Sequence, residues 1–192
     1  MAKNTANLNE TDTEQVQDQS FSRELYEWFE AILTALMMVI VVMIFFLRPA
    51  NVEGPSMENT LHENDRLIFT DIGFTPEYGD IVIVDSEGLG KFIVKRVIAT
   101  EGQTVDIDFA NATVAVDGVI LDEKYISTVT ANDEAGHEYP VAVPPNSVFV
   151  MGDNRMHSTD SRSARVGFVN VDDIYGKVIF RFYPFSKMGV VE

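Results

Sequence analysis

Two short segments carry residue types that can do chemistry together. Ser56 follows Gly-Pro in a turn-prone stretch at residues 54–57, and Lys95 lies in an apolar stretch at residues 91–100. A serine hydroxyl becomes a nucleophile when a nearby base takes its proton, and an unprotonated lysine amine can be that base. The two segments therefore predict nucleophilic catalysis by a Ser-Lys pair.

Strand geometry predicts that Lys95 has apolar neighbours, which favour the unprotonated form of its amine. Residues two apart in a strand share a face, so Ile93, Lys95 and Val97 point one way and Arg96 points the other. Burial beside two β-branched side chains removes solvation and lowers the pKa of Lys95. Arg96 cannot be the base because a guanidinium stays protonated. The alternative is a structural lysine whose ammonium reaches solvent from a half-buried strand.

A third polar segment, residues 152–162, directly follows a predicted strand. It is either a polar loop held by Asp-Arg pairs or a shell that supports a catalytic group. His157 in this segment suggests a Ser-His-Asp triad as an alternative, but the surroundings of Lys95 offer a different base. His62, His137 and His157 lack zinc-motif spacing and the chain has no cysteine. We expect no metal or cofactor, and only a metal site built from scattered ligands stays open.

One apolar run of membrane length precedes all three segments. Residues 31–47 are apolar except for Thr34, and a helix of this length spans roughly 25 Å. A cleavable signal peptide would need a basic start and an Ala-x-Ala pattern after the run, and a buried core helix would show a polar face. We therefore expect a transmembrane anchor helix over residues 21–48, after an acidic, disordered tail at residues 1–20.

Residues 49–192 are predicted to form a β-rich domain. Short runs of Val, Ile and Phe are bounded by turn residues, and Asp117-Gly118 is a strong hairpin signal. The predicted fold class is mainly β, a barrel or sandwich preceded by one transmembrane helix. Residues 122–140 are expected to form a loop excursion. The expected strands are residues 66–70, 80–85, 91–100, 104–109, 112–116, 119–121, 147–151 and 177–183.

Charge and position limit the partners. The formal net charge is −16, and an acidic surface repels phosphate backbones, which argues against nucleic acid. Ser56 follows the end of the apolar run by nine positions, so its hydroxyl lies within about 32 Å of the membrane exit. The site must therefore act near membrane lipid. One arginine precedes the run (Arg23) and one follows it (Arg48), so the count of basic residues is close to a tie and charge alone leaves the orientation open.

The ordered motifs resemble a bacterial type I signal peptidase of the short, single-anchor kind found in Gram-positive bacteria. Residues 54–61 look like the nucleophile box of that family, and residues 94–98 resemble its lysine box. Residues 79–82 resemble its third box, and residues 152–162 its last box. The resemblance covers the apolar run and most of residues 50–192, and the acidic tail lies outside it.

The resemblance implies roles for the central residues. Ser56 would attack the scissile carbonyl and Lys95 would be the general base. Ser158 would hydrogen-bond and orient the lysine amine, and Gly152 would leave room beside that lysine. Gly54 stands where some relatives carry a serine whose hydroxyl helps the oxyanion hole, so that donor is missing here.

Further residues of the last box would give structural support. The resemblance implies an ion pair between Asp160 and Arg162. Asp153 and Arg155 also match the family, with structural roles expected for both. One departure is Asn59, where the family usually has proline.

The implied substrates are secretory preproteins, cleaved after small residues at Ala-x-Ala sites. A strand edge near Ser56 could pair with the extended cleavage region, and shallow apolar pockets would admit alanine. Met57, Ile93 and Val97 are the pocket candidates by position. The resemblance also implies a single-pass protein of the cell membrane, with a cytoplasmic N-terminus and an extracytoplasmic catalytic domain. We expect a monomer.

Two other hypotheses compete with this one. A non-enzymatic, membrane-tethered β domain is disfavoured because Ser56, Lys95 and Ser158 are all present. A self-cleaving Ser-Lys repressor is disfavoured by the anchor and by the missing DNA-binding helices.

Overall fold

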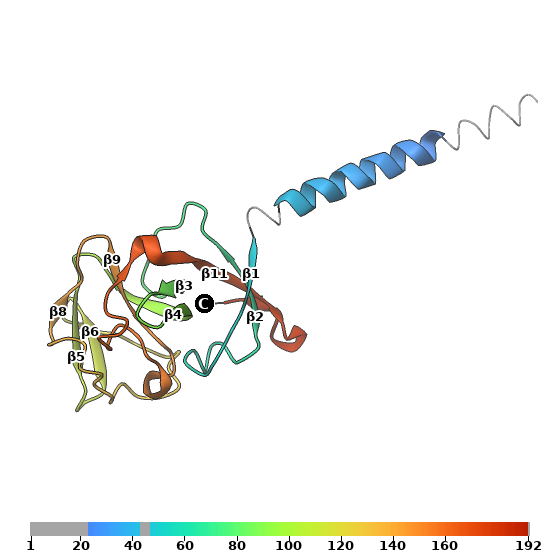
Figure 1. Cartoon of the computed structure of the whole chain (residues 1–192). Helices are drawn as coiled ribbons and strands as arrows, with labels where there is room; N and C mark the ends of the chain where they lie inside the picture. The colour runs from blue at the N-terminus through green and yellow to red at the C-terminus, as the bar shows by residue number, and fades with distance from the viewer. Residues whose placement is uncertain (1–22, 43–46, 192) are drawn as a thin grey trace, which may run out of the picture. The chain divides into compact units, whose positions relative to one another are not determined.

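The computed structural model describes residues 23–42 and 47–191, which belong to two compact units, Met1–Phe45 and Phe46–Glu192. In the first unit, a 20-residue helix, Arg23–Val42, is long and apolar enough to cross a membrane (Figure 1). At about 1.5 Å per residue it measures roughly 30 Å. The Thr34 hydroxyl donates to the Glu30 carbonyl oxygen at 2.8 Å, so the one polar side chain of the run is satisfied within the helix.

The predicted anchor differs from the structure at its end. The tail at residues 1–20 and the last part of the apolar run, residues 43–46, lie outside the described residues. Arg48, which we placed in the anchor, instead begins strand β1. Pro49 follows it within this strand, where a missing N–H is tolerated because β1 is the last strand of its sheet.

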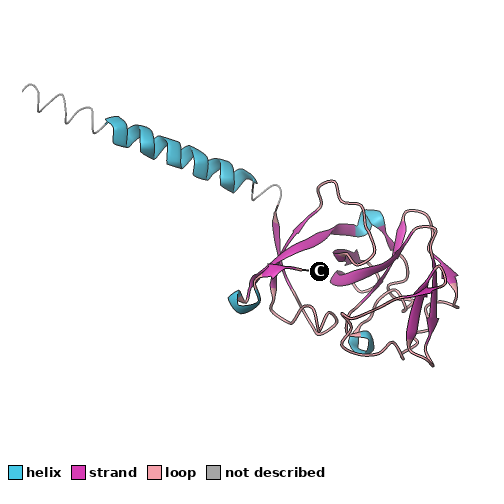
Figure 2. Ribbon diagram, turned by 180° about the vertical axis from the view of Figure 1, so that it is seen from behind, coloured by secondary structure: helices cyan, strands magenta, loops and turns pink. Residues whose placement is uncertain are grey.

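The second unit consists of strands and loops, and its helical segments are short 3₁₀ turns (Figure 2). A large sheet has the strand order β1-β2-β11-β3-β4-β9-β10, with β12 paired to β11, and a small sheet has the order β7-β6-β5-β8. Every paired strand in both sheets is antiparallel. The strands are β1 (Arg48–Asn51), β2 (Arg66–Thr70), β3 (Ile81–Ser86), β4 (Lys91–Thr100), β5 (Thr104–Asp108), β6 (Thr113–Val116), β7 (Val119–Ile120), β8 (Val141–Ala142), β9 (Ser147–Met151), β10 (Val169–Asn170), β11 (Ile174–Tyr183) and β12 (Gly189–Val190), and the 3₁₀ helices are η1 (Arg155–His157), η2 (Val171–Asp173) and η3 (Phe185–Lys187).

The predicted fold class, mainly β with one apolar N-terminal helix, is confirmed, and the arrangement is a sandwich rather than a closed barrel. β2, β4 and β9 have the predicted bounds. Asp117 and Gly118 form the predicted hairpin turn, with φ of 51° and 78°. Residues 122–140 contain no strand, as expected.

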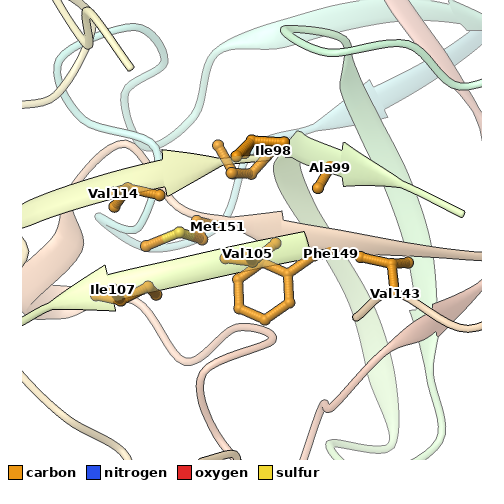
Figure 3. Close-up of a cluster of buried hydrophobic side chains, with 9 residues drawn as sticks. Ile98, Ala99, Val105, Ile107, Val114, Val143, Phe149 and Met151 are labelled. Carbon is orange, nitrogen blue, oxygen red and sulfur yellow. The ribbon is translucent and has the colours of Figure 1, made fainter. Parts of the chain in front are cut away.

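The two sheets pack through a buried apolar cluster, which Figure 3 shows from within. Ile98 and Ala99 of β4 and Phe149 of β9 come from the large sheet, and Val105 and Val114 come from the small one. This contact packs the C-terminal half of β4, within the large sheet, against the small sheet. The other half of β4 is left to form the candidate site.

Candidate active site

The structure brings Ser56 and Lys95 together. Lys95 lies on β4, and Ser56 lies in the turn that follows β1. The Lys95 Nζ donates to the Ser56 Oγ at 2.8 Å and to the Val94 carbonyl oxygen at 3.0 Å. A hydroxyl at this distance can pass its proton to the amine once the amine is unprotonated.

Burial favours the unprotonated form of Lys95 that could accept the serine proton. The side chain is 3% exposed, and its neighbours on the same face, Ile93 and Val97, belong to one buried apolar cluster. Burial is the main cause that lowers the pKa of Lys95 to about 8. The Asp160 carboxylate acts in the opposite direction, and the positive charge of Lys91 lowers the pKa further. The amine is therefore largely free in mildly alkaline solution.

The polar segment at residues 152–162 contacts the backbone on either side of the Ser56 side chain's attachment, at Pro55 and Ser56. The Asn154 N–H donates to the Ser56 carbonyl oxygen at 3.0 Å, and the Asn154 side-chain amide donates to the Pro55 carbonyl oxygen at 3.2 Å. Gly152 lies so close that a Cβ built there would be 2.5 Å from the Ser56 carbonyl oxygen and 2.5 Å from the Ser158 Cβ. Only glycine allows this approach. We predicted that the missing side chain of Gly152 leaves space beside Lys95. The close contacts of Gly152 are with Ser56 and Ser158.

The ion pair between Asp160 and Arg162 forms as expected. Arg162 Nε donates to Asp160 Oδ1 at 2.8 Å, and both side chains have no exposed area. The Asp160 Oδ2 also accepts from the Gly152 N–H at 2.9 Å and from the Ser158 hydroxyl at 2.7 Å. The implied hydrogen bond between Ser158 and the lysine amine is not found in the described chain, where the Lys95 Nζ donates to Ser56 and Val94 instead.

Arg96 and Asp153 form a second buried pair on the opposite face of β4. Arg96 Nε and Nη2 donate to the two Asp153 carboxylate oxygens at 2.9 and 2.8 Å. Arg96 Nη1 donates to the Gly79 carbonyl oxygen at 2.8 Å, and the guanidinium lies 4.1 Å from the Tyr125 ring centroid. Asp153 also accepts from the Thr60 hydroxyl at 2.5 Å. This pair ties β4 to the turn after Ser56 and to the polar segment.

Arg155 has the expected structural role, but its partners were not predicted from the sequence. Arg155 has no exposed area, and it pairs with Glu123 and donates to the Thr130 hydroxyl at 2.6 Å. Glu123 and Thr130 lie in the loop at residues 122–140, where no periodicity marked them. Asn154 lies inside the polar segment, but its residue type does not reveal that it donates to the Pro55 and Ser56 carbonyl oxygens. His157 Nδ1 contacts Asn154 Oδ1 at 3.1 Å rather than Ser56, so the triad alternative gains no support from the structure.

A cavity of 1040 Å³ opens at the Ser56–Lys95 pair. Its lining includes Ala50, Ile83 and Val94, which are apolar, and the catalytic candidates themselves. Ile93 lines this cavity as predicted. Met57 and Val97 do not: they are 1% and 0% exposed and belong to two hydrophobic clusters.

The backbone of β4 is open on one side beside the cavity. β3 pairs with β4 along its first six residues, from Lys91 to Arg96, whereas β9 pairs with it only from Arg96 onward. Between Lys91 and Lys95, no strand of the described chain pairs with the other edge of β4. A free strand edge of this kind can pair with an extended peptide. Among residues 23–42 and 47–191, no three His, Cys, Asp or Glu side chains gather in a way that could hold a metal ion.

The Ser56 hydroxyl is hydrogen-bonded to a buried amine at a cavity wall beside an open strand edge. In such an arrangement an unprotonated lysine can activate a serine nucleophile. A family model described as "Signal peptidase, peptidase S26" matches residues 25–183. The chain belongs to this family of signal peptidases.

Individual relatives agree with this family. The chain is 35% identical over 173 residues to signal peptidase I of Bacillus licheniformis, covering 85% of this chain and 91% of the relative. It is 36% identical over 171 residues to signal peptidase I T of Bacillus subtilis, covering 84% and 87% of the two chains. A crystal structure of a signal peptidase I from Enterococcus faecalis shares 30% identity, with a TM-score of 0.44 over 54% of this chain and 97% of that one.

Proposed function

We propose that the protein is a membrane-anchored endopeptidase that removes signal peptides from secretory preproteins with a Ser56–Lys95 dyad. The observation that carries this proposal is the 2.8 Å hydrogen bond between a half-buried serine hydroxyl and a buried lysine amine. Membership of the signal peptidase family supplies the substrate class. The roles of the two residues follow from their chemistry.

In the first step, the unprotonated Lys95 amine takes the Ser56 hydroxyl proton while Oγ attacks the scissile carbonyl carbon. The resulting ammonium then gives that proton to the leaving amine, which departs as the new N-terminus of the mature protein. A water molecule, deprotonated by the same amine, attacks the acyl-enzyme carbonyl; the ester bond to Ser56 Oγ breaks, the ammonium returns the proton to Oγ, and the signal peptide is freed. One base therefore serves both halves of the reaction.

Charge on the reacting oxygen needs hydrogen-bond donors. The Ser56 backbone N–H has no partner within the described part of the chain and is our candidate for one donor. Gly54 has no side chain that could supply another. Removal of one such donor typically costs about 3 kcal/mol of transition-state stabilisation, so the Ser56 N–H should be essential.

The substrate would bind as an added strand. Its cleavage region would pair with the free edge of β4 between Lys91 and Lys95, within the cavity that is also lined by β1 residues such as Ala50. Alternate side chains would then face the apolar lining formed by Ile83 and Val94. A shallow apolar pocket favours alanine, which supports cleavage after small residues.

We place this site at a membrane. The helix Arg23–Val42 is a candidate membrane span. We place the N-terminus in the cytoplasm and the β unit outside, since preproteins are processed after export. A protease added to intact cells should therefore digest the β unit, and digestion only after cell lysis would reverse the orientation.

The direct test is preprotein cleavage by the purified full-length chain in detergent. Ser56→Ala and Lys95→Ala should each abolish cleavage, and Lys95→Arg should do the same because a guanidinium cannot accept the proton. Ser186→Ala and Lys187→Ala are matched controls in η3, and both should cleave like the wild type. Full activity of Ser56→Ala or Lys95→Ala would refute the dyad. A wild type that binds preproteins without cleaving them would favour the non-enzymatic hypothesis.

A further inference from the structure

Most described lysines and arginines of this acidic protein form ion pairs, but those in the catalytic cavity do not. The formal net charge is −16, so carboxylates are available almost everywhere. Within residues 23–42 and 47–191, eight lysines and arginines form ion pairs with Asp or Glu. The described cations without a carboxylate partner are Arg66, Lys91, Lys95, Arg165 and Lys187.

Three of these five cations line the catalytic cavity: Lys91, Lys95 and Arg165. Of the other two, Arg66 lies 5.3 Å from the Tyr183 ring centroid, and Lys187 lies in η3. Lys95 is accounted for by the proposed chemistry. Lys91 and Arg165 are exposed side chains on the cavity wall. Neither takes part in the proposed proton transfer, although the charge of Lys91 helps to lower the pKa of Lys95.

Lys91 and Arg165 flank the same turn. Lys91 begins β4 directly after the turn at residues 87–90, which follows β3. A Cβ built on Gly88 of this turn would collide with the Arg165 carbonyl oxygen, so the segment that carries Arg165 packs against the turn. The two cations therefore lie at the same end of the cavity.

The position of Lys91 relative to the dyad follows from strand geometry. Lys91, Ile93 and Lys95 are two apart and share one face of β4. At about 3.3 Å per residue, Lys91 lies roughly 13 Å along the strand from Lys95. A peptide paired with this edge would place a side chain beside Lys91 about four residues from the bond that is cleaved.

Two carboxylates in the cavity do not cancel this positive charge. Asp85 pairs in register with Phe92, so both side chains lie on the face of the hairpin opposite to Lys91. Glu53 lies on the segment that leads to Ser56. Neither forms an ion pair with Lys91 or Arg165, which leaves both cations open to a ligand.

We propose that Lys91 and Arg165 bind an acidic side chain of the substrate and so select preproteins with Asp or Glu about four residues from the cleaved bond. This specificity rests on the proposed peptidase function. Ion pairs at exposed positions contribute modestly, and we expect a preference of about twofold to fivefold in kcat/KM for Glu over Gln. The preference should weaken as salt rises, because salt screens exposed charges.

The test uses matched synthetic substrates that carry Glu, Gln or Lys at this distance, before or after the cleaved bond. The quantity compared is the ratio of kcat/KM for Glu to that for Gln, measured at one pH for each enzyme. This ratio cancels any general effect of Lys91 on the pKa of Lys95. The full-length wild type should prefer Glu on one side of the bond, and Lys91→Gln/Arg165→Gln should bring the ratio to one. Lys187→Gln should keep the wild-type ratio.

Three outcomes would overturn the proposal. The wild type could cleave Glu and Gln substrates equally, or the double variant could retain the preference. The variants could also differ from wild type only when vesicles of anionic lipid replace neutral detergent, which would assign the two cations to lipid headgroups. Cleavage of the Gln substrate separates these results from failure of the proposed function, in which no substrate would be cleaved by any enzyme.

Discussion

Gly152→Ala tests the closest contact in the site. A Cβ at this position would lie 2.5 Å from the Ser56 carbonyl oxygen and 2.5 Å from the Ser158 Cβ, whereas ordinary van der Waals contact begins near 3.4 Å. The backbone at Ser56 must therefore move by about 0.9 Å relative to residue 152, or residue 152 must retreat by as much. A misplacement of about 1 Å in a catalytic group can reduce the rate about 100-fold. We expect this loss in kcat/KM, together with about 1–3 kcal/mol of lost stability from overpacking.

The assay is steady-state cleavage of a preprotein, with thermal unfolding measured in parallel. Gly189→Ala is the matched control because a Cβ there meets nothing within 4 Å, and it should leave the rate unchanged. Ser158→Gly added to Gly152→Ala removes the collisions with the Ser158 Oγ and Cβ. It should restore part of the stability but little activity, since the contact with Ser56 remains. A folded Gly152→Ala variant with wild-type kcat/KM would refute the argument that this contact sets the position of the nucleophile.

Two further predictions concern the base and the buried ion pairs. With the pKa of Lys95 at about 8, the free amine is the active form, so kcat/KM should rise about tenfold per pH unit from pH 6 to 7 and level off above pH 8; a flat profile over this range would exclude an amine base. Asp153→Ala leaves the Arg96 guanidinium buried without its carboxylate, which should lower the free energy of unfolding by about 3–5 kcal/mol in urea titrations. Asp122→Ala, which removes an exposed ion pair with Lys124, is its control, and equal urea midpoints for the two variants would contradict the reasoning.

Much of the fold could be predicted because strand periodicity was strong. β4 and β9 combine many β-branched and apolar residues, and their bounds were found without error. β1 was missed because Arg-Pro-Ala-Asn has no β-strand pattern. The two-residue strands β8, β10 and β12 were missed because two residues cannot show a period.

The sequence placed the candidate residues on their elements better than it predicted their contacts. Alternation along β4 correctly placed Lys95 among apolar neighbours on one face. The same alternation could not show that β9 covers β4 from Arg96 onward, so Val97 was assigned to a pocket although it is buried. The hydrogen bond of Ser158 also escaped prediction, because a hydroxyl can turn to any nearby acceptor and sequence does not say that Asp160 is nearest.

The buried pair between Arg96 and Asp153 has a consequence beyond stability. Lys95 and Arg96 are adjacent, so a slip of β4 by one residue would exchange their faces. The nucleophile would then meet a guanidinium, which cannot give up its proton at any physiological pH. Two hydrogen bonds from Arg96 to Asp153 hold the strand against this error. An arginine that takes no part in proton transfer thereby decides which of two neighbouring basic residues reaches the serine.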